Sequence, residues 1–336
     1  MTEANEDPDN AIMLSLANAE TGTDLALAKE MAAAEEQARD YLLQAKSANT
    51  LRGYRADWNH FTAWCTQHDK QYLPAQAETV ALYLTVISNT HKCSTLQRRL
   101  VAISQAHQAA GFETPTTEAP VRATWAGIRR VKGTRQEGKT PTLTADIRRM
   151  VDTLPETKTG QRDRALLLFG FAGAFRRSEL VSLTRADLLV TSEGITVTLR
   201  RSKTDQEGEG RKVGIPYGSR PHTCPVRALL AWLEAAEIEA GPLFRGIHRN
   251  GTILPRALSD KSVALIVKKT AEAAGLESAL YAGHSLRSGL ATSAAQAGVS
   301  ERAIMKQTGH ASVNMVRRYI RDGSLFRENA AAEVGL

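Results

Sequence analysis

Two arginines and a histidine in this chain of 336 residues occur in patterns that suit the binding of an anion. Arg176 follows a long apolar run, and Glu179 stands one helical turn later, where a carboxylate can brace an arginine. In G-H-S-L-R (283–287), His284 and Arg287 are also three residues apart, so both can face one ligand at the start of a helix. Positive groups that converge in this way predict a site for a phosphate.

Three further residues add a lysine, a second histidine and a nucleophile to this set. Lys203 lies in R-R-S-K-T-D (200–205), near the tip of a predicted hairpin; His310 precedes a short predicted helix, and Tyr319 follows nine residues later. Taken singly, a lysine at a turn is usually solvated and a tyrosine on a helix is usually part of a core. A tyrosine among several positive groups, however, suits covalent attack on phosphorus. The sequence contains no G-x-x-x-x-G-K-[ST] loop, carboxylate pair or cluster of metal ligands, so neither ATP-driven nor metal chemistry is predicted.

Composition excludes several classes of protein. Hydrophobic residues make up 42% of the chain, which is enough for buried cores, and no apolar run approaches the ~18–20 residues of a membrane span. The acidic N-terminus lacks the basic-then-apolar order of a signal peptide. The three cysteines form no C-x-x-C pair, which excludes a disulfide-stapled secreted domain and most cysteine zinc sites. We therefore expect a cytoplasmic protein with reduced thiols.

The net charge of +7 is unevenly distributed along the chain. Residues 1–40 carry two basic and ten acidic residues, a net charge of −8, so the remainder carries +15. A basic body points towards a polyanion, most often a nucleic acid. The acidic segment 1–40 has few large apolar residues before its alanine- and glutamate-rich part, and we expect a tail that is disordered or partly helical.

The elements that must position the candidate residues divide the chain into two domains. Residues 41–130 are predicted to be all-helical, beginning with a helix capped by Asn49 or Thr50 that shows apolar residues at helical spacing. Further helices are expected near 77–88, from Ser94 and from Pro120. The polar faces of this domain are basic, with ten Lys or Arg against five Asp or Glu.

A linker and a larger domain follow. Residues 131–141 contain two glycines, a proline and no apolar residue after Val131, which is typical of a flexible linker. Residues 142–336 are predicted to be mainly helical, with one β-hairpin in a small antiparallel sheet, formed by 195–199 and 213–215. The expected helices of this domain lie near 225–240, 259–274, 285–297, 300–308 and 312–321.

The order and spacing of the motifs resemble the tyrosine recombinase (phage integrase) family from about residue 45 onwards. The matching features are the R-x-S-E box at 176–179, the hairpin lysine, H-x-x-R, G-H and the final tyrosine. Each is weakly specific alone, and all of them in order are highly specific. Within the family the Cre type is most similar, although His310 stands where Cre has tryptophan. The resemblance implies an all-helical core-binding domain and an α+β catalytic domain, without the N-terminal arm-binding domain of lambda-type integrases.

The resemblance also implies a reaction that needs no ATP, metal or cofactor. Tyr319 would attack a DNA phosphate, form a 3′-phosphotyrosine and free a 5′-hydroxyl, while Arg176 and Arg287 hold the non-bridging oxygens. Lys203 would be the general acid for the leaving oxygen and His310 a hydrogen-bond donor to the phosphate.

Two more residues have implied roles near these. His284 would transfer a proton near the tyrosine or contact the phosphate, and Glu179 would orient the pocket.

The implied partner is double-stranded DNA. Four protomers, monomeric or weakly associated when free, would act on two sites through a Holliday junction, and an accessory protein can take part. Residues 324–336 resemble a segment that docks on a neighbouring protomer. The candidate DNA contacts match positions at which the Cre type approaches DNA: Arg52, Arg98, Arg99 and Lys261.

Other functions share some of these features. A type IB topoisomerase uses a similar pocket, but the Cre-like helical domain and the hairpin argue against it. A DNA-binding regulator that has lost catalysis would not need every catalytic position filled. A hairpin telomere resolvase is disfavoured by the modest length of the chain.

Overall fold

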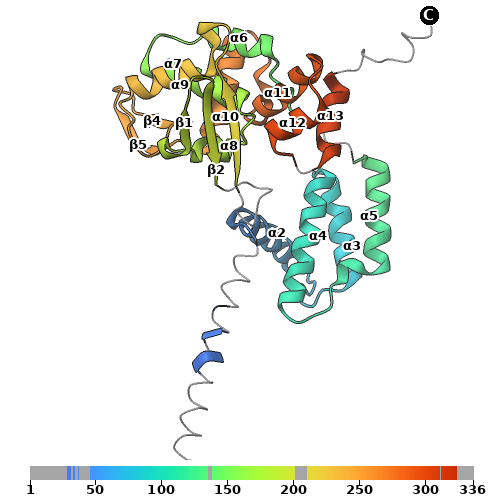
Figure 1. The fold of residues 1–336 in the computed structure, drawn as a ribbon. Coiled ribbons are helices and arrows are strands. Elements are labelled where there is room, and N and C mark those ends of the chain that lie inside the picture. Colours follow the sequence, from blue (N-terminus) through green and yellow to red (C-terminus); the bar gives the residue numbers. More distant parts are fainter. Residues whose placement is uncertain are drawn as a thin grey trace, which may run out of the picture. The chain divides into compact units, whose positions relative to one another are not determined.

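The computed structural model describes residues 46–134, 138–200, 210–310 and 312–323, together with 29–31, 33, 34 and 37 near the N-terminus. The chain separates into two compact units, 1–136 and 137–336 (Figure 1). The described residues between 29 and 37 are helical. Most of the predicted tail and the whole of the segment 324–336 lie outside the described residues, and no described helix is long and apolar enough to cross a membrane.

Helices alone form the regular structure of the described part of the first unit. They are α2 (Ala48–Gln67), α3 (Ala77–Ser88), α4 (Cys93–Ala109) and α5 (Ala119–Lys132), with a short 3-10 turn at Pro115–Thr117. The spacing of the apolar residues explains the packing, because one face of each helix supplies the core. Its fully buried members include Phe61 from α2, Leu84 from α3, Ile103 from α4 and Val121 from α5.

Helix ends in this unit differ from the predicted ones by a few residues. Helix α2 is capped by Ser47, whose hydroxyl accepts a hydrogen bond from the Thr50 amide, rather than by Asn49 or Thr50. Helix α5 runs to Lys132, so the first two residues of the predicted linker are helical. Near the other end of the predicted linker, the Thr140 amide donates to Leu280 O, so this part of the linker is bonded to the second unit.

The second unit combines helices with two small antiparallel sheets. Strands β1 (Leu188–Val190), β2 (Gly194–Leu199) and β3 (Arg211–Pro216) lie in that order in one sheet, and β4 (Arg245–Ile247) pairs with β5 (Ile253–Ala257) in the other. The helices are α6 (Thr144–Asp152), α7 (Lys158–Ala172), α8 (Arg177–Ser182), α9 (Pro225–Ala235), α10 (Asp260–Ala273), α11 (His284–Gln296), α12 (Glu301–Thr308) and α13 (Val313–Gly323).

The core of the second unit surrounds α7. The apolar run in this helix is buried without interruption from Ala165 to Phe169, as expected of a helix that is covered on every side. Helix α9 and strand β2 contribute Trp232 and Val197 to the same core. A smaller cluster joins α11, α12 and α13, and Tyr319 belongs to it.

The predicted mainly helical fold with a small antiparallel sheet is confirmed. Strands β2 and β3 pair as expected, with Ile195 opposite Ile215 and Val197 opposite Val213. Several details were wrong or missed, and helices α6 and α7 were not among the predicted ones. Helix α9 ends at Ala235, not near 240, because Glu237 takes a positive φ of 53° and the chain turns Ile238 back into the core. Strands β1, β4 and β5 were not predicted, since each is too short to show a clear alternation.

Candidate active site

Arg176 is positioned by the sharp turn between α7 and α8. The buried residue Ala174 takes a positive φ of 48°, which redirects the chain after the apolar helix. Arg176 then caps α8. Its backbone amide donates to Glu179 Oε2 at 2.9 Å and its Nη1 to Glu179 Oε1 at 2.5 Å. Because Glu179 is only 3% exposed, this carboxylate holds the arginine in one orientation, as the i, i+3 spacing predicts.

Arg287 approaches the same turn from the first turn of α11. Its side chain is 1% exposed, and Nη1 donates to Ala174 O at 2.8 Å. The buried Nη2 has no hydrogen-bond partner among the described residues. Burial and, to a smaller extent, the neighbouring Arg176 lower the pKa of Arg287 to about 10, although Glu179 opposes the shift. An arginine buried beside another arginine is poised to bind an anion, which would relieve both penalties.

Tyr319 lies against both histidines of the candidate set. Its Oη is 3.0 Å from Nε2 of His284, the first residue of α11, and its ring centroid is 5.8 Å from that of His310. Burial lowers the pKa of His284, and so do Arg287 and Arg176. A neutral imidazole at this distance can accept the phenol proton.

His310 follows the left-handed C-cap of α12, Gly309, whose φ is 63°. The Thr308 hydroxyl donates to Ile304 O at 2.7 Å, so its oxygen accepts from His310 Nδ1 at 2.8 Å. Burial lowers the pKa of His310 to about 3, and Arg287, Arg176 and other nearby cations contribute. The imidazole is therefore neutral here, with its proton on Nδ1 and its Nε2 free to accept.

One cation of this cluster was missed by the sequence analysis. Arg211, the first residue of β3, is buried at its guanidinium and interacts electrostatically with Glu179 and Arg176. The available signal is strand alternation, because Arg211 shares the inward face of β3 with Val213 and Ile215. The described cluster thus holds three guanidinium groups and one carboxylate.

The predicted site residues divide into three groups. Arg176, Glu179, His284, Arg287, His310 and Tyr319 come together in the second unit through the contacts and electrostatic interactions above. Lys203 lies outside the described residues, although the strands that lead to and from it are present.

The third group is the set of candidate DNA contacts. Arg52 and Lys261 are exposed, and the side chain of Arg98 is 53% exposed although it pairs with Asp57. Arg99 was expected on the basic polar face of its helix. It is instead 6% exposed and donates to Tyr83 Oη at 3.1 Å, so it lies in the interior of the helical unit.

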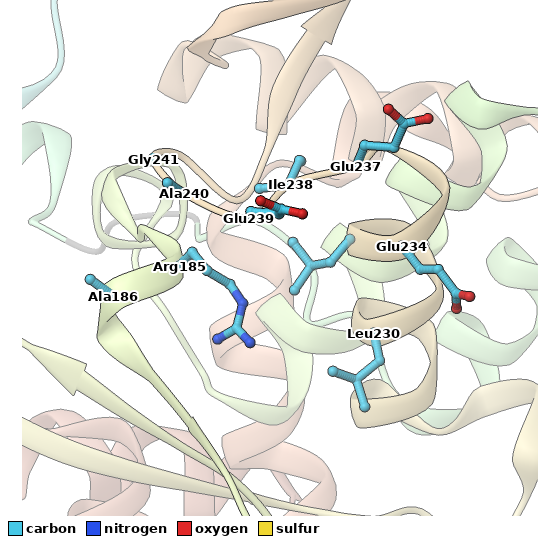
Figure 2. A pocket seen from close by; sticks show the side chains of 10 residues that line it. Arg185, Ala186, Leu230, Glu234, Glu237, Ile238, Glu239, Ala240 and Gly241 are labelled. Atoms are coloured by element: carbon cyan, nitrogen blue, oxygen red, sulfur yellow. The ribbon is translucent and has the colours of Figure 1, made fainter.

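A hollow in the second unit lies away from the cationic cluster, so the presence of a cavity does not identify the site. A hollow of about 730 Å³ in the second unit lies between Arg185 and the end of α9, where Glu234 and Glu237 border it (Figure 2). None of the predicted site residues lines it. Among the described residues, no group of three or more His, Cys, Asp or Glu side chains could hold a metal ion.

Comparison with known proteins gives consistent matches. The model of the phage integrase family matches residues 142–324. The chain is 44% identical to an integrase/recombinase xerD homolog of Selenomonas ruminantium over 326 residues, which cover 96% of this chain and 93% of the relative. It is 24% identical to the recombinase cre of Escherichia phage P1 over 299 residues, 83% of this chain and 85% of the relative.

Solved structures share the fold at low sequence identity. A XerH site-specific recombinase bound to a palindromic difH substrate matches with a TM-score of 0.58 and 19% identity, over 76% of this chain and 72% of that one. A lambda integrase dimer bound to a COC′ core site matches with a TM-score of 0.56 and 17% identity, over 88% and 95% of the two chains.

Proposed function

The chain belongs to the phage integrase family of tyrosine recombinases, and from this premise we propose which of its residues bind, cut and rejoin DNA. Its activity is site-specific recombination, in which DNA strands are cleaved and religated. The observation that carries the assignment of the active site is the contact between Tyr319 and His284 beside buried Arg287 and half-buried Arg176.

Tyr319 is the proposed nucleophile. Its Oη attacks the scissile phosphorus, the bond between phosphorus and the 5′-oxygen breaks, and a 3′-phosphotyrosine forms. At an ordinary tyrosine pKa of about 10, forming the phenolate at pH 7 costs about 4 kcal/mol. His284, 3.0 Å from Oη, accepts the proton during attack and offsets this cost.

The arginines bind the phosphate. Arg176 and Arg287 donate to its non-bridging oxygens, on which negative charge grows in the transition state. Glu179 keeps Arg176 in place through two hydrogen bonds. The arginines carry more positive charge than the Glu179 carboxylate neutralises, and the bound DNA phosphate balances the remainder.

His310 and Lys203 complete the proposed set. To donate from Nε2 while Nδ1 donates to Thr308, His310 must gain a proton, and a bound phosphate favours that gain. Lys203 gives a proton to the leaving 5′-oxygen. The phosphotyrosine retains the energy of the broken linkage, so attack by a 5′-hydroxyl of the partner strand reverses the chemistry and releases Tyr319.

Double-stranded DNA is the proposed partner, as the neighbouring XerH and lambda integrase structures contain it. We propose that four protomers assemble on two sites, through a Holliday junction, in the cytoplasm. Arg52, Arg98 and Lys261 are the proposed surface contacts with DNA, whereas Arg99 supports its own unit from within. Residues 324–336, outside the described range, are proposed to dock on a neighbouring protomer.

The test is trapping on a nicked suicide substrate that carries candidate sites from the DNA next to the protein's own gene. The wild-type protein should give a denaturant-resistant protein–DNA band, and Tyr319→Phe should bind the same DNA without forming it. A band of equal intensity with Tyr319→Phe would reject the nucleophile. Tight binding without any wild-type band would favour a non-cutting regulator, and relaxation of supercoiled DNA without a specific site would favour a topoisomerase.

A further inference from the structure

Arg211 lies where the β2–β3 hairpin leaves its sheet. It is paired with Leu199 in the last register position of the two strands, and the chain between them, 200–210, includes Lys203. Its Nε and Nη2 are buried and have no hydrogen-bond partner among the described residues. The side chain of Arg211 therefore points into the protein.

The guanidinium of Arg211 contacts the turn that carries His310. Nη1 donates to Gln307 O, in the last turn of α12, at 3.1 Å. Gly309 packs against the same group, because a Cβ built there would lie 2.6 Å from Nε of Arg211. No larger residue fits this position without moving the arginine, and His310 is the next residue along the chain.

Gln307 strengthens the connection from the opposite direction. Its Nε2 donates to Gly214 O of β3 at 3.1 Å and to Ala172 O, at the end of α7, at 2.8 Å. Two residues after Ala172, the carbonyl of Ala174 accepts from Arg287. The end of α12 is thus joined to β3 at two points and to the turn that positions both phosphate-binding arginines.

Burying the Arg211 guanidinium near Arg176 is unfavourable for the stability of the fold. Burial lowers the pKa of Arg211, and Arg176 lowers it further, while Glu179 partly opposes both. Burying a cation beside other cations costs free energy that a neutral side chain would avoid. This cost indicates that Arg211 is retained for its contacts with the turn before His310 rather than for stability.

We propose that Arg211 is a positioning residue for DNA cleavage, which holds the Gly309–His310 turn against strand β3. His310, the proposed hydrogen-bond donor, is then held at a fixed position relative to the arginines that bind the phosphate. This inference rests on the proposed function, and it assigns to Arg211 a part that the motifs of the family resemblance above do not include.

The first test is single-turnover cleavage of the suicide substrate by the full chain. Arg211→Ala should slow cleavage by about 100-fold, the effect of a small misplacement of catalytic groups, with DNA affinity close to that of wild type. Lys212→Ala is the matched control, because it removes an exposed cation from the next position of the same strand. Arg211→Lys, which keeps the charge but not the fork of donors, should recover only part of the rate.

A double-mutant cycle with His310→Ala separates positioning from a general loss of structure. If Arg211 acts through His310, adding Arg211→Ala to His310→Ala should slow cleavage by less than about threefold. A substrate with sulfur at the 5′-bridging position gives a second readout, because a thiolate leaves without a proton donor. It should restore cleavage by Lys203→Ala and only partly restore that of Arg211→Ala.

The outcomes are distinguishable. Wild-type cleavage rates in Arg211→Ala, a loss equal to that of Lys212→Ala, full additivity with His310→Ala, or full rescue by the sulfur substrate would each overturn the inference. Failure of the wild-type protein to form any adduct would instead overturn the proposed function.

Discussion

Each of the two units contains a buried arginine, but the units differ in how many carboxylates balance the positive charge. In the helical unit, buried Arg99 lies near buried Asp57, with Nε 3.7 Å from Oδ1, and Arg99 also donates to Tyr83 Oη. In the second unit, Arg176, Arg287 and Arg211 share one buried carboxylate, that of Glu179. Unpartnered nitrogens do not separate the two units, because Arg99 Nε is also buried without a hydrogen-bond partner among the described residues.

The comparison shows how a stabilising arginine differs from one kept for a ligand. Arg99 lies beside the Asp57 carboxylate within its own unit and donates to Tyr83, so its removal should destabilise that unit. Arg287 is satisfied only in part, so its removal should affect function and leave stability almost unchanged. The following predictions test that difference, beginning with the largest effect.

Replacing Arg287 should be the most damaging change to the reaction. Arg287→Met should slow single-turnover cleavage by about 1,000-fold, or about 4 kcal/mol, because a donor to the developing charge is lost. The free energy of unfolding without DNA should change by less than about 1 kcal/mol, since a buried cation is removed together with its hydrogen bond to Ala174 O. Cleavage kinetics and urea denaturation measure the two effects. A large loss of stability would show that Arg287 stabilises its unit, as Arg99 is predicted to do, and would contradict the prediction.

Replacing Arg99 should have the converse effect. Arg99→Met should destabilise the helical unit by about 3 kcal/mol, because it leaves the buried Asp57 and the Tyr83 hydroxyl with fewer partners. Hydrogen exchange of the α4 amides in the full chain measures this. The exposed Arg122→Met in α5 is the matched control, and it should cost less than about 1 kcal/mol. Equal protection of wild type and Arg99→Met would contradict the prediction.

The excess positive charge should also appear as a pH dependence of stability. Because the folded pKa of His310 is lowered to about 3 from 6.5, the unfolded chain binds a proton between these values and the folded chain does not. Stability should therefore fall as the pH drops below 6.5, at most by about 1.4 kcal/mol per unit, less for partial exposure. In denaturation experiments from pH 7 to 5, wild type should lose stability relative to His310→Gln as the pH falls. Parallel curves would show that His310 does not contribute.

Binding of a simple anion should distinguish the arginines around Glu179 from Arg99, and its effect on stability is the smallest of those predicted here. Inorganic phosphate at a few times its dissociation constant should stabilise the catalytic unit by on the order of 1 kcal/mol. Thermal denaturation with chloride at matched ionic strength measures it. Arg99→Met should keep this response and Arg287→Met should lose it. A phosphate response retained by Arg287→Met would mean that the anion binds elsewhere.

Local patterns predicted much of the fold. Helix α3 begins and ends at the predicted residues because Val80, Leu84 and Ile87 mark one face without ambiguity. The strands β2 and β3 alternate clearly. The pairs at three-residue spacing, Arg176 with Glu179 and His284 with Arg287, lie in the same site because helix geometry fixes their relative directions.

Features that depend on tertiary contacts were harder to predict. Arg98 and Arg99 are sequence neighbours, and charge alone does not say which one faces inward. Arg99 does stand three residues after Leu96 and four before Ile103, on the buried face of α4, so the period carried a signal. The inward direction of Arg211 needs the partner that receives it, Gln307, 96 residues later.

The most direct test of the account is to map the covalent linkage between the protein and DNA. The adduct trapped on a suicide substrate would be digested with a protease, and the peptide attached to 5′-end-labelled DNA would be identified by mass spectrometry. The account predicts a peptide containing Tyr319, joined through a 3′-phosphate, with the label retained on the protein. Attachment at another residue, or through a 5′-phosphate, would contradict it.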